Sequence, residues 1–134
     1  MTAPVVDAEP LITAIKGAVT AAGVLIADSR KPDGVGNKPY IVAFFDAGRV
    51  EDKSLRSRDG FSLYASFQCA GLEPWSARFA VHRLRQAVLS MAGTSVGGMT
   101  VLMPSHEYPG PMTRDDDADP ALFVQIDEWR FRVG

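Results

Sequence analysis

The stretch FSLYASFQCA, residues 61–70, decides the fold, because apolar and polar side chains alternate along it. Side chains of a β-strand point to opposite faces in turn, so this alternation predicts a half-buried strand. The stretch YIVAFF, residues 40–45, is β-branched or aromatic at most positions and predicts a central strand buried on both sides. The expected inward positions of the first strand are Phe61, Leu63, Ala65, Phe67 and Cys69.

Two segments around these strands carry apolar residues at the spacing of an amphipathic helix. The first runs from about Ala8 to Ala22, with Pro10 in its first turn and Gly23 after its end. The second runs from Pro74 to about Met91 and places Arg78 and Arg85 on its polar side. Its apolar stripe consists of Ala77, Ala80, Val81, Leu84, Ala87, Val88 and Met91.

The remaining elements are shorter or less regular. Val24–Ala27 and Met99–Met103 are expected to be strands, and residues 28–39 and 104–120 are expected to be loops rich in Pro, Gly and Asp. This order of elements predicts one α+β domain over residues 1–134. We expect a mostly antiparallel sheet of about five strands, with two helices packed on it and long extended loops.

The last predicted strand, residues 122–133, changes phase along its length. Leu122, Val124 and Ile126 share one face, whereas Trp129, Phe131 and Val133 fall one step out of phase. A β-bulge at Asp127–Glu128 would bring both sets to the core. Alternatively, the strand leaves the sheet and packs its end elsewhere. We favour the bulge.

Composition narrows the classes of function. The chain has 134 residues, of which 46% are hydrophobic, with a net charge of −2 and one cysteine. Such a chain builds a core, forms no internal disulfide and has no bulk positive field to attract nucleic acid. Residues 1–7 resemble no signal peptide, and no apolar run reaches the roughly 20 residues of a membrane helix. We therefore expect synthesis in the cytoplasm.

No arrangement of residues in the sequence matches a catalytic motif. His82 is expected to be a solvated surface residue, His106 to have a structural or loop role, and Cys69 to be a small buried hydrophobe. The acidic run Asp115, Asp116, Asp117 and Asp119 lacks the spacing of a calcium loop and is expected to be solvated. The tryptophans, Trp75 and Trp129, are expected in the core. We predict a non-enzymatic protein with no cofactor and no metal site.

The connection from Asp46 to Gly60 is longer and more charged than a hairpin needs. It is either a hairpin extended past the core or a mobile loop. We expect it to be an interaction arm, and we add the acidic run and the polar side of the second helix as further contact surfaces. The candidate interface residues are Arg49, Glu51, Asp52, Lys53, Arg56, Arg58, Asp59, Arg78, Arg85, Asp115, Asp116 and Asp117.

The order and texture of these elements resemble the tail terminator, or tail-completion, proteins of long-tailed bacteriophages. The resemblance covers about residues 11–133. It rests on KPYIV (residues 38–42), the charged excursion, the alternating strand, PWSARFAVHRLRQAV (residues 74–88) and DEWRFRV (residues 127–133).

The resemblance implies a virion protein of the tail and neck that is not an enzyme. Its members form a six-membered ring that caps the finished tail tube and joins it to the head-side connector or stopper protein, and DNA passes through the lumen. The implied partners are therefore further copies of this chain, the tube protein, the connector and genomic DNA, with no membrane.

The sequence is also compatible with three other functions. Head–tail connector, or head-completion, proteins share parts of this texture. A cytoplasmic domain that binds a small ligand or peptide would need an apolar pocket, which Trp75 and Trp129 could line. A small hydrolase or nuclease would use the acidic run, residues 115–119, to hold a metal ion.

Overall fold

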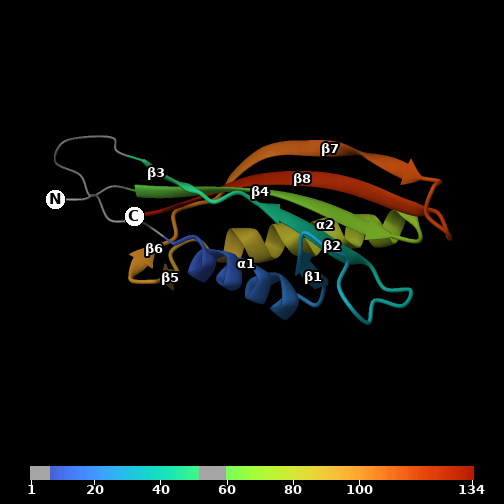
Figure 1. Ribbon diagram of the computed structural model, residues 1–134, viewed down its shortest axis with the longest axis horizontal. Helices are drawn as coiled ribbons and strands as arrows, with labels where there is room; N and C mark the ends of the chain where they lie inside the picture. The colour runs from blue at the N-terminus through green and yellow to red at the C-terminus, as the bar shows by residue number, and fades with distance from the viewer. Residues whose placement is uncertain (1–6, 52–59) are drawn as a thin grey trace.

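The computed structural model describes residues 7–51 and 60–134, which form a long twisted sheet with two helices along one of its faces (Figure 1). The helices are α1 (Glu9–Ala21) and α2 (Pro74–Ser90). The strands are β1 (Leu25–Asp28), β2 (Tyr40–Phe45), β3 (Arg49–Glu51), β4 (Gly60–Gly71), β5 (Ser95–Val96), β6 (Met99–Thr100), β7 (Ser105–Asp115) and β8 (Leu122–Val133).

The described residues build a six-stranded sheet in the order β1-β2-β4-β8-β7, with β3 also paired to β4. β1 pairs with β2 in parallel, and the other pairs of this sheet are antiparallel. β5 and β6 form a separate small hairpin. The predicted α+β class and mostly antiparallel sheet are therefore confirmed.

The main core lies between the sheet and the helices. The predicted inward positions of β4 are at most 2% exposed, and the predicted apolar stripe of α2 is buried along its whole length. Gly71 allows this packing at the end of β4, because a Cβ there would overlap the Ser76 hydroxyl and lie 2.8 Å from the Ala77 nitrogen. Both helices lie within a residue of their predicted bounds.

A second, smaller cluster covers part of the opposite face of the sheet. Val35, from the 29–39 loop, packs there with Tyr40 and Ala70. Leu122 and Val124 of β8 pack against the same cluster. This end of the sheet is thus covered on both faces by apolar side chains, whereas Phe44 of β2 is 41% exposed. The prediction that β2 is buried on both sides therefore holds for only part of the strand.

β8 contains no bulge, which corrects the sequence prediction. Its pairing with β4 runs without a shift from Phe61↔Val133 to Gly71↔Phe123. Gln125 and Asp127 consequently share the face of Trp129, whereas Leu122 and Val124 face the second cluster. The two apolar sets are out of phase because each faces a different cluster, and Ile126 is only half-buried.

Residues 105–115, predicted to be part of a loop, form the edge strand β7 along β8. Proline cannot donate a ladder hydrogen bond, so it is tolerated at sheet edges and bulges. Register shifts lie between His106 and Tyr108 and between Pro109 and Met112, so Pro109 and Pro111 fall at irregular positions of an edge. By contrast, the predicted strand at 99–103 is reduced to the two residues of β6 and a bridge between Val101 and Val133.

The charged connection begins as an extension of the sheet. After a kink at residues 46–48, β3 pairs with β4 from Arg49↔Ser62 to Glu51↔Gly60. The Asp46 carboxylate holds this kink by accepting hydrogen bonds from the backbone nitrogens of Gly48 at 2.9 Å and Tyr64 at 3.1 Å. These residues therefore belong to a hairpin extended past the helices.

Candidate functional site

A buried carboxylate links three elements under the β7–β8 edge. Asp127 is 0% exposed, and it accepts hydrogen bonds from Arg85 Nε at 3.2 Å and Arg85 Nη2 at 3.0 Å. Trp129 Nε1 donates to it at 2.9 Å, and His106 Nε2 lies 2.7 Å from its Oδ1. An ionised carboxylate only accepts hydrogen bonds, so His106 is the donor. We call these four residues the Asp127 network.

The Asp127 network keeps its carboxylate ionised. Burial by itself would raise the pKa of Asp127, but the hydrogen bonds from Arg85, Trp129 and His106 together bring that pKa below its ordinary value. The hydrogen bond with Asp127 in turn raises the pKa of Arg85. A buried charge persists when it is paired and its lone pairs are satisfied. The network therefore binds α2, β7 and β8 together.

His106 occupies its position through an aromatic contact as well. Its ring stacks on Trp129 with centroids 4.5 Å apart and an angle of 18° between the planes. The two residues are partners across β7 and β8, and a register shift follows immediately in β7. This shift lies in β7 and is separate from the bulge predicted in β8, which is absent.

Cys69 and His82 lie where the sequence predicted them. Cys69 is fully buried, and burial raises the pKa of its thiol, which disfavours a nucleophilic thiolate. His82 is exposed on α2. Within residues 7–51 and 60–134, no group of three or more His, Cys, Asp or Glu side chains could hold a metal ion. No helix in the described part of the chain has the length and apolarity needed to cross a membrane.

Three large apolar side chains of α2 are exposed. Trp75, expected in the core, is 64% exposed, and Phe79 one turn later is 38% exposed. Leu89 is 48% exposed at the other end of α2. Trp129 is 3% exposed, as expected. The exposure of Trp75 is a correction to the sequence prediction, and its cause is that the buried stripe of α2 lies on the opposite side of the helix.

The candidate interface residues that the structure describes fall into three separate places. Arg49 and Glu51 lie on β3, and Arg49 is exposed. Asp52, Lys53, Arg56, Arg58 and Asp59 lie outside the described residues. Arg78 is exposed on α2, whereas Arg85 turns toward Asp127 instead of pointing into solvent, which corrects its assignment to a free polar face.

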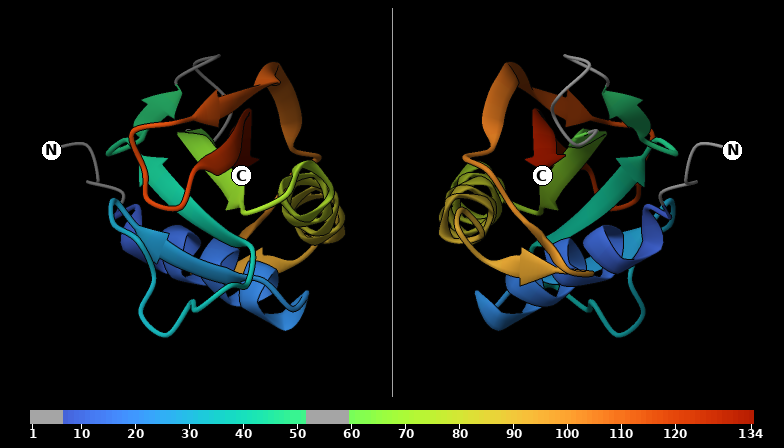
Figure 2. Two further views of the ribbon diagram at one scale, coloured as in Figure 1. Left: turned by 90° about the vertical axis from the view of Figure 1, so that its right-hand side faces the viewer. Right: turned by 90° about the vertical axis from the view of Figure 1, so that its left-hand side faces the viewer.

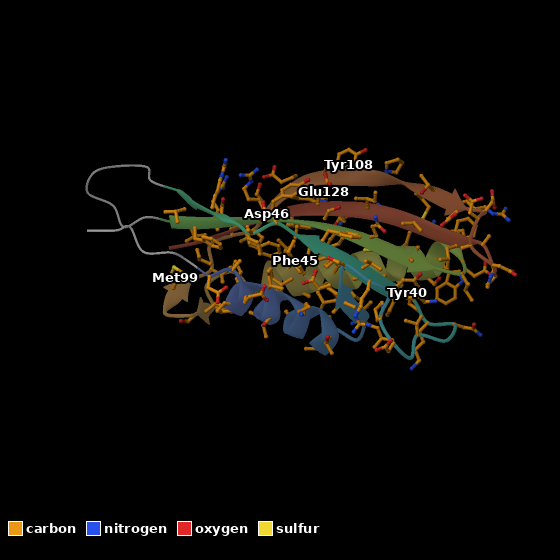
Figure 3. The ribbon with its side chains drawn as sticks, in the orientation of Figure 1. Tyr40, Phe45, Asp46, Met99, Tyr108 and Glu128 are labelled. Carbon is orange, nitrogen blue, oxygen red and sulfur yellow. The ribbon has the colours of Figure 1, made fainter. Side chains whose placement is uncertain are left out.

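The acidic run forms the turn between β7 and β8. Asp115, Asp116, Asp117 and Asp119 are all exposed, and Arg114 pairs with Asp116. Asp119 and Pro120 line the same small cleft as Lys31 and Lys38 of the 29–39 loop, close to Tyr40 (Figure 3 labels Tyr40). The turn therefore lies on the β1–β2 side at its end of the sheet.

An apolar pocket lies toward the other end of the molecule, where Figure 3 labels Met99. Its volume is about 290 Å³, and Leu11, Phe61, Val96, Met99 and Val133 supply much of its lining. Ligand pockets in proteins run from about 300 to 1,000 Å³, so this pocket is at the small end of that range.

The chain resembles known proteins in its structure and not in its sequence. No family model and no curated protein matches the sequence. The structure, however, superimposes on a chain from "Virion of native gene transfer agent (GTA) particle" with a TM-score of 0.67. The two chains share a fold. The similarity covers 97% of this chain and 98% of the other, at 16% sequence identity.

Proposed function

We propose that this chain is a structural protein of a phage-like particle and that it terminates the tail tube. The observation that carries the proposal is the shared fold, which spans nearly the full length of both this chain and a chain of a gene transfer agent virion. The order of elements that resembles tail terminators is present in the fold, including the long alternating strand and the arginine-rich helix. The proposed role is assembly, with no catalytic step.

The shape of the described part suits a subunit with several contact surfaces. β4 and β8 are each twelve residues long, and at one end they extend past the helices together with β3 (Figure 1). The β7–β8 turn marks the opposite end (Figure 1). A ring subunit must contact two copies of itself and partners above and below, and head-to-tail contacts close into a ring when the rotation closes.

The partners in this proposal follow from the resemblance. They are further copies of the chain in a six-membered ring, the tube protein on one side and the head-side connector or stopper protein on the other. Genomic DNA would pass through the lumen, and the protein would reside in the neck of the virion after synthesis in the host cytoplasm. A head-completion protein is the alternative, because the shared fold alone supports either position.

Deletion of the gene in a strain that makes the particle separates these two roles. Loss of a tail terminator should leave stable DNA-filled heads beside unattached tails of irregular length in electron micrographs. Loss of a head-completion protein should instead leave tails of normal length and heads that release their DNA. Restoring the gene in trans should restore joined particles in both cases. Normal particles from the deletion strain would refute both roles.

A further inference from the structure

The outward face of α2 combines exposed aromatic rings with unpaired positive charge. α2 contains three arginines and no acidic residue. Neither Arg78 nor His82 forms a hydrogen bond or ion pair with another residue in the described part of the chain. Arg83 lies over the Phe79 ring at 5.0 Å, and its Nε finds no hydrogen-bond partner among the described residues. We call Trp75, Arg78, Phe79, His82 and Arg83 the α2 face.

Such a combination is typical of a protein-binding surface. Tryptophan, tyrosine and arginine dominate the binding energy of interfaces. A tryptophan exposed on a monomer leaves a large apolar surface in contact with water, and a partner could bury that surface. Trp75 and Phe79 are four residues apart, so they lie one above the other on the same side of the helix. The α2 face therefore offers an aromatic anchor flanked by cations.

The same chain carries the complementary charge on its β7–β8 turn. Four of the five residues from Asp115 to Asp119 are aspartates, and each is exposed. Arg114 pairs with Asp116 at the surface, with side chains 61% and 73% exposed. Lys31 and Lys38 line the neighbouring cleft, but no ion pair joins either lysine to the turn within the described residues. Most of this negative charge is thus unpaired within one subunit.

The two charged surfaces face different directions. Viewed along the long axis, α2 lies on one side of the molecule and the β7–β8 turn swings to the other, toward β1 and β2 (Figure 2). One subunit cannot bring them together. Two complementary patches on different sides of one molecule produce a heterologous contact, which is the kind that builds rings and not isolated two-fold dimers.

We propose that the α2 face of one copy of this chain binds the acidic β7–β8 turn of the next copy. The inference rests on the proposed function and names the contact that would close the ring. The aspartates would pair with Arg78 and Arg83, and Trp75 would be covered by the neighbouring subunit. Complementary charges mainly fix orientation and speed association, so the buried aromatic side chains would hold the subunits together.

Charge reversal on either surface tests this contact. We would compare Arg78→Glu/His82→Glu on the α2 face with Asp116→Lys/Asp117→Lys on the turn, using sedimentation velocity of the full chain. Each double variant should weaken self-association at least about tenfold, because like charges then face each other. Combining all four substitutions in one chain should restore assembly, because opposite charges meet again.

The matched control is Lys16→Glu/Thr20→Glu on α1, which introduces two glutamates at the same spacing on a different helix. It should assemble as the wild type does. Melting curves of every variant should stay near that of the wild type, because the replaced side chains at positions 78, 82 and 117 are exposed. A variant that assembles normally despite reversal on either surface overturns the proposed contact, and so does a quadruple variant that stays dissociated.

Intrinsic fluorescence provides a second readout. Trp75 is 64% exposed and Trp129 is 3% exposed, so burial of Trp75 on assembly should shift the emission to the blue. Trp75→Ala should abolish that shift and weaken assembly. Emission that stays unchanged when the wild type assembles would show that the contact lies elsewhere, although a ring and the proposed function could still stand.

Two further results have defined meanings. If the α2 reversal abolishes binding to double-stranded DNA in a gel-shift assay while self-association is unchanged, the α2 face is a nucleic-acid surface and the proposal is wrong. If the wild type stays monomeric at every concentration, the contact is refuted. Finding the same protein in the neck of purified particles would then preserve the proposed function, and its absence from them would refute that as well.

Discussion

At the scale of single residues, Asp127 is the side chain that the local sequence pattern describes least well. Its position in β8 points it into the core, where a lone carboxylate would be strongly disfavoured. Arg85 of α2 and His106 of β7 come from segments distant in sequence, and their hydrogen bonds to Asp127 offset the cost of burying its charge. Its partners come from different elements, so the Asp127 network should act as a unit.

Removing the carboxylate should destabilise the fold measurably. Asp127→Ala leaves Arg85 without its partner and takes the acceptor away from Trp129 and His106. Because the Arg85 side chain is 37% exposed and can rehydrate, we expect a loss of about 2–4 kcal/mol in the free energy of unfolding. Urea denaturation measures it. Glu107→Gln, which breaks the surface pair with Arg130, should cost only about 0–1 kcal/mol, and equal losses would contradict this assignment.

The same carboxylate predicts a direction for the acid dependence of stability. The pKa of Asp127 is lower in the folded chain than its ordinary value, so ionisation of Asp127 stabilises the folded state relative to the unfolded state. Its contribution is complete above the ordinary pKa of about 4 and is lost as pH falls through the lower, folded pKa. Unfolding free energies measured from neutral pH downward should fall less steeply for Asp127→Asn than for the wild type. Parallel curves would show that Asp127 does not contribute.

At the scale of elements, close approach of the main chain determines where α2 packs on the sheet. The helix begins three residues after β4 ends, and Ser76 in its first turn donates to the Glu73 carbonyl at 2.8 Å. Gly71 leaves room for that turn. The orientation of α2 then determines which side chains meet Asp127 and which form the α2 face. A small change at this junction would therefore affect both regions.

A matched pair of glycine substitutions tests this junction. Gly71→Ala should lower the unfolding free energy by about 1–3 kcal/mol, because the new methyl group meets the Ser76 hydroxyl and the backbone of Ala77. Gly17→Ala in the interior of α1 should raise it by roughly 0.5–1 kcal/mol, because nothing lies within 4 Å and alanine restricts the unfolded chain. Thermal and urea unfolding of both variants provide the comparison, and effects of the same sign would contradict the close packing of Gly71 against Ser76 and Ala77.

At the scale of the whole molecule, the long strands extend beyond the helices at one end (Figure 1). The β3–β4 pairing ends at Glu51↔Gly60, so the hairpin reaches the boundary of the described residues with its two strands still paired. The candidate interaction arm, residues 46–60, therefore starts on an ordered part of the sheet. That it contacts another protein stays a prediction.

Shortening the arm tests its role without touching the core. Replacing residues 52–59 with Asn-Gly would close the hairpin directly after the Glu51–Gly60 pair, since Asn-Gly favours the tight turns of hairpins. The melting temperature should stay near that of the wild type, whereas joined particles should fail to form in a complementation assay. A control that replaces the same eight residues with a Gly/Ser segment of equal length separates length from side-chain chemistry. Normal particles from the Asn-Gly variant would exclude an essential arm.

Much of the architecture follows from the sequence because it depends on local periodicity. The alternation in residues 61–70 and the helical stripes around Ile15 and Leu84 specify elements whose buried sides are visible in the order of residues alone. Regular strands and helices repeat every two or 3.6 residues, so these faces could be assigned without knowing what covers them. The α+β class and both helices were predictable for this reason.

The tertiary structure alone decided which faces are covered and by what. Leu122 and Val124 are covered by the 29–39 loop, and β7 is a strand because β8 offers it an edge. Trp75 is exposed because it lies on the side of α2 away from the buried stripe, and no described residue covers it. Arg85 looked like a free surface charge until Asp127 and His106 were brought beside it. Each of these outcomes depends on contacts between residues far apart in the chain, and periodicity along one segment carries no information about its distant neighbours.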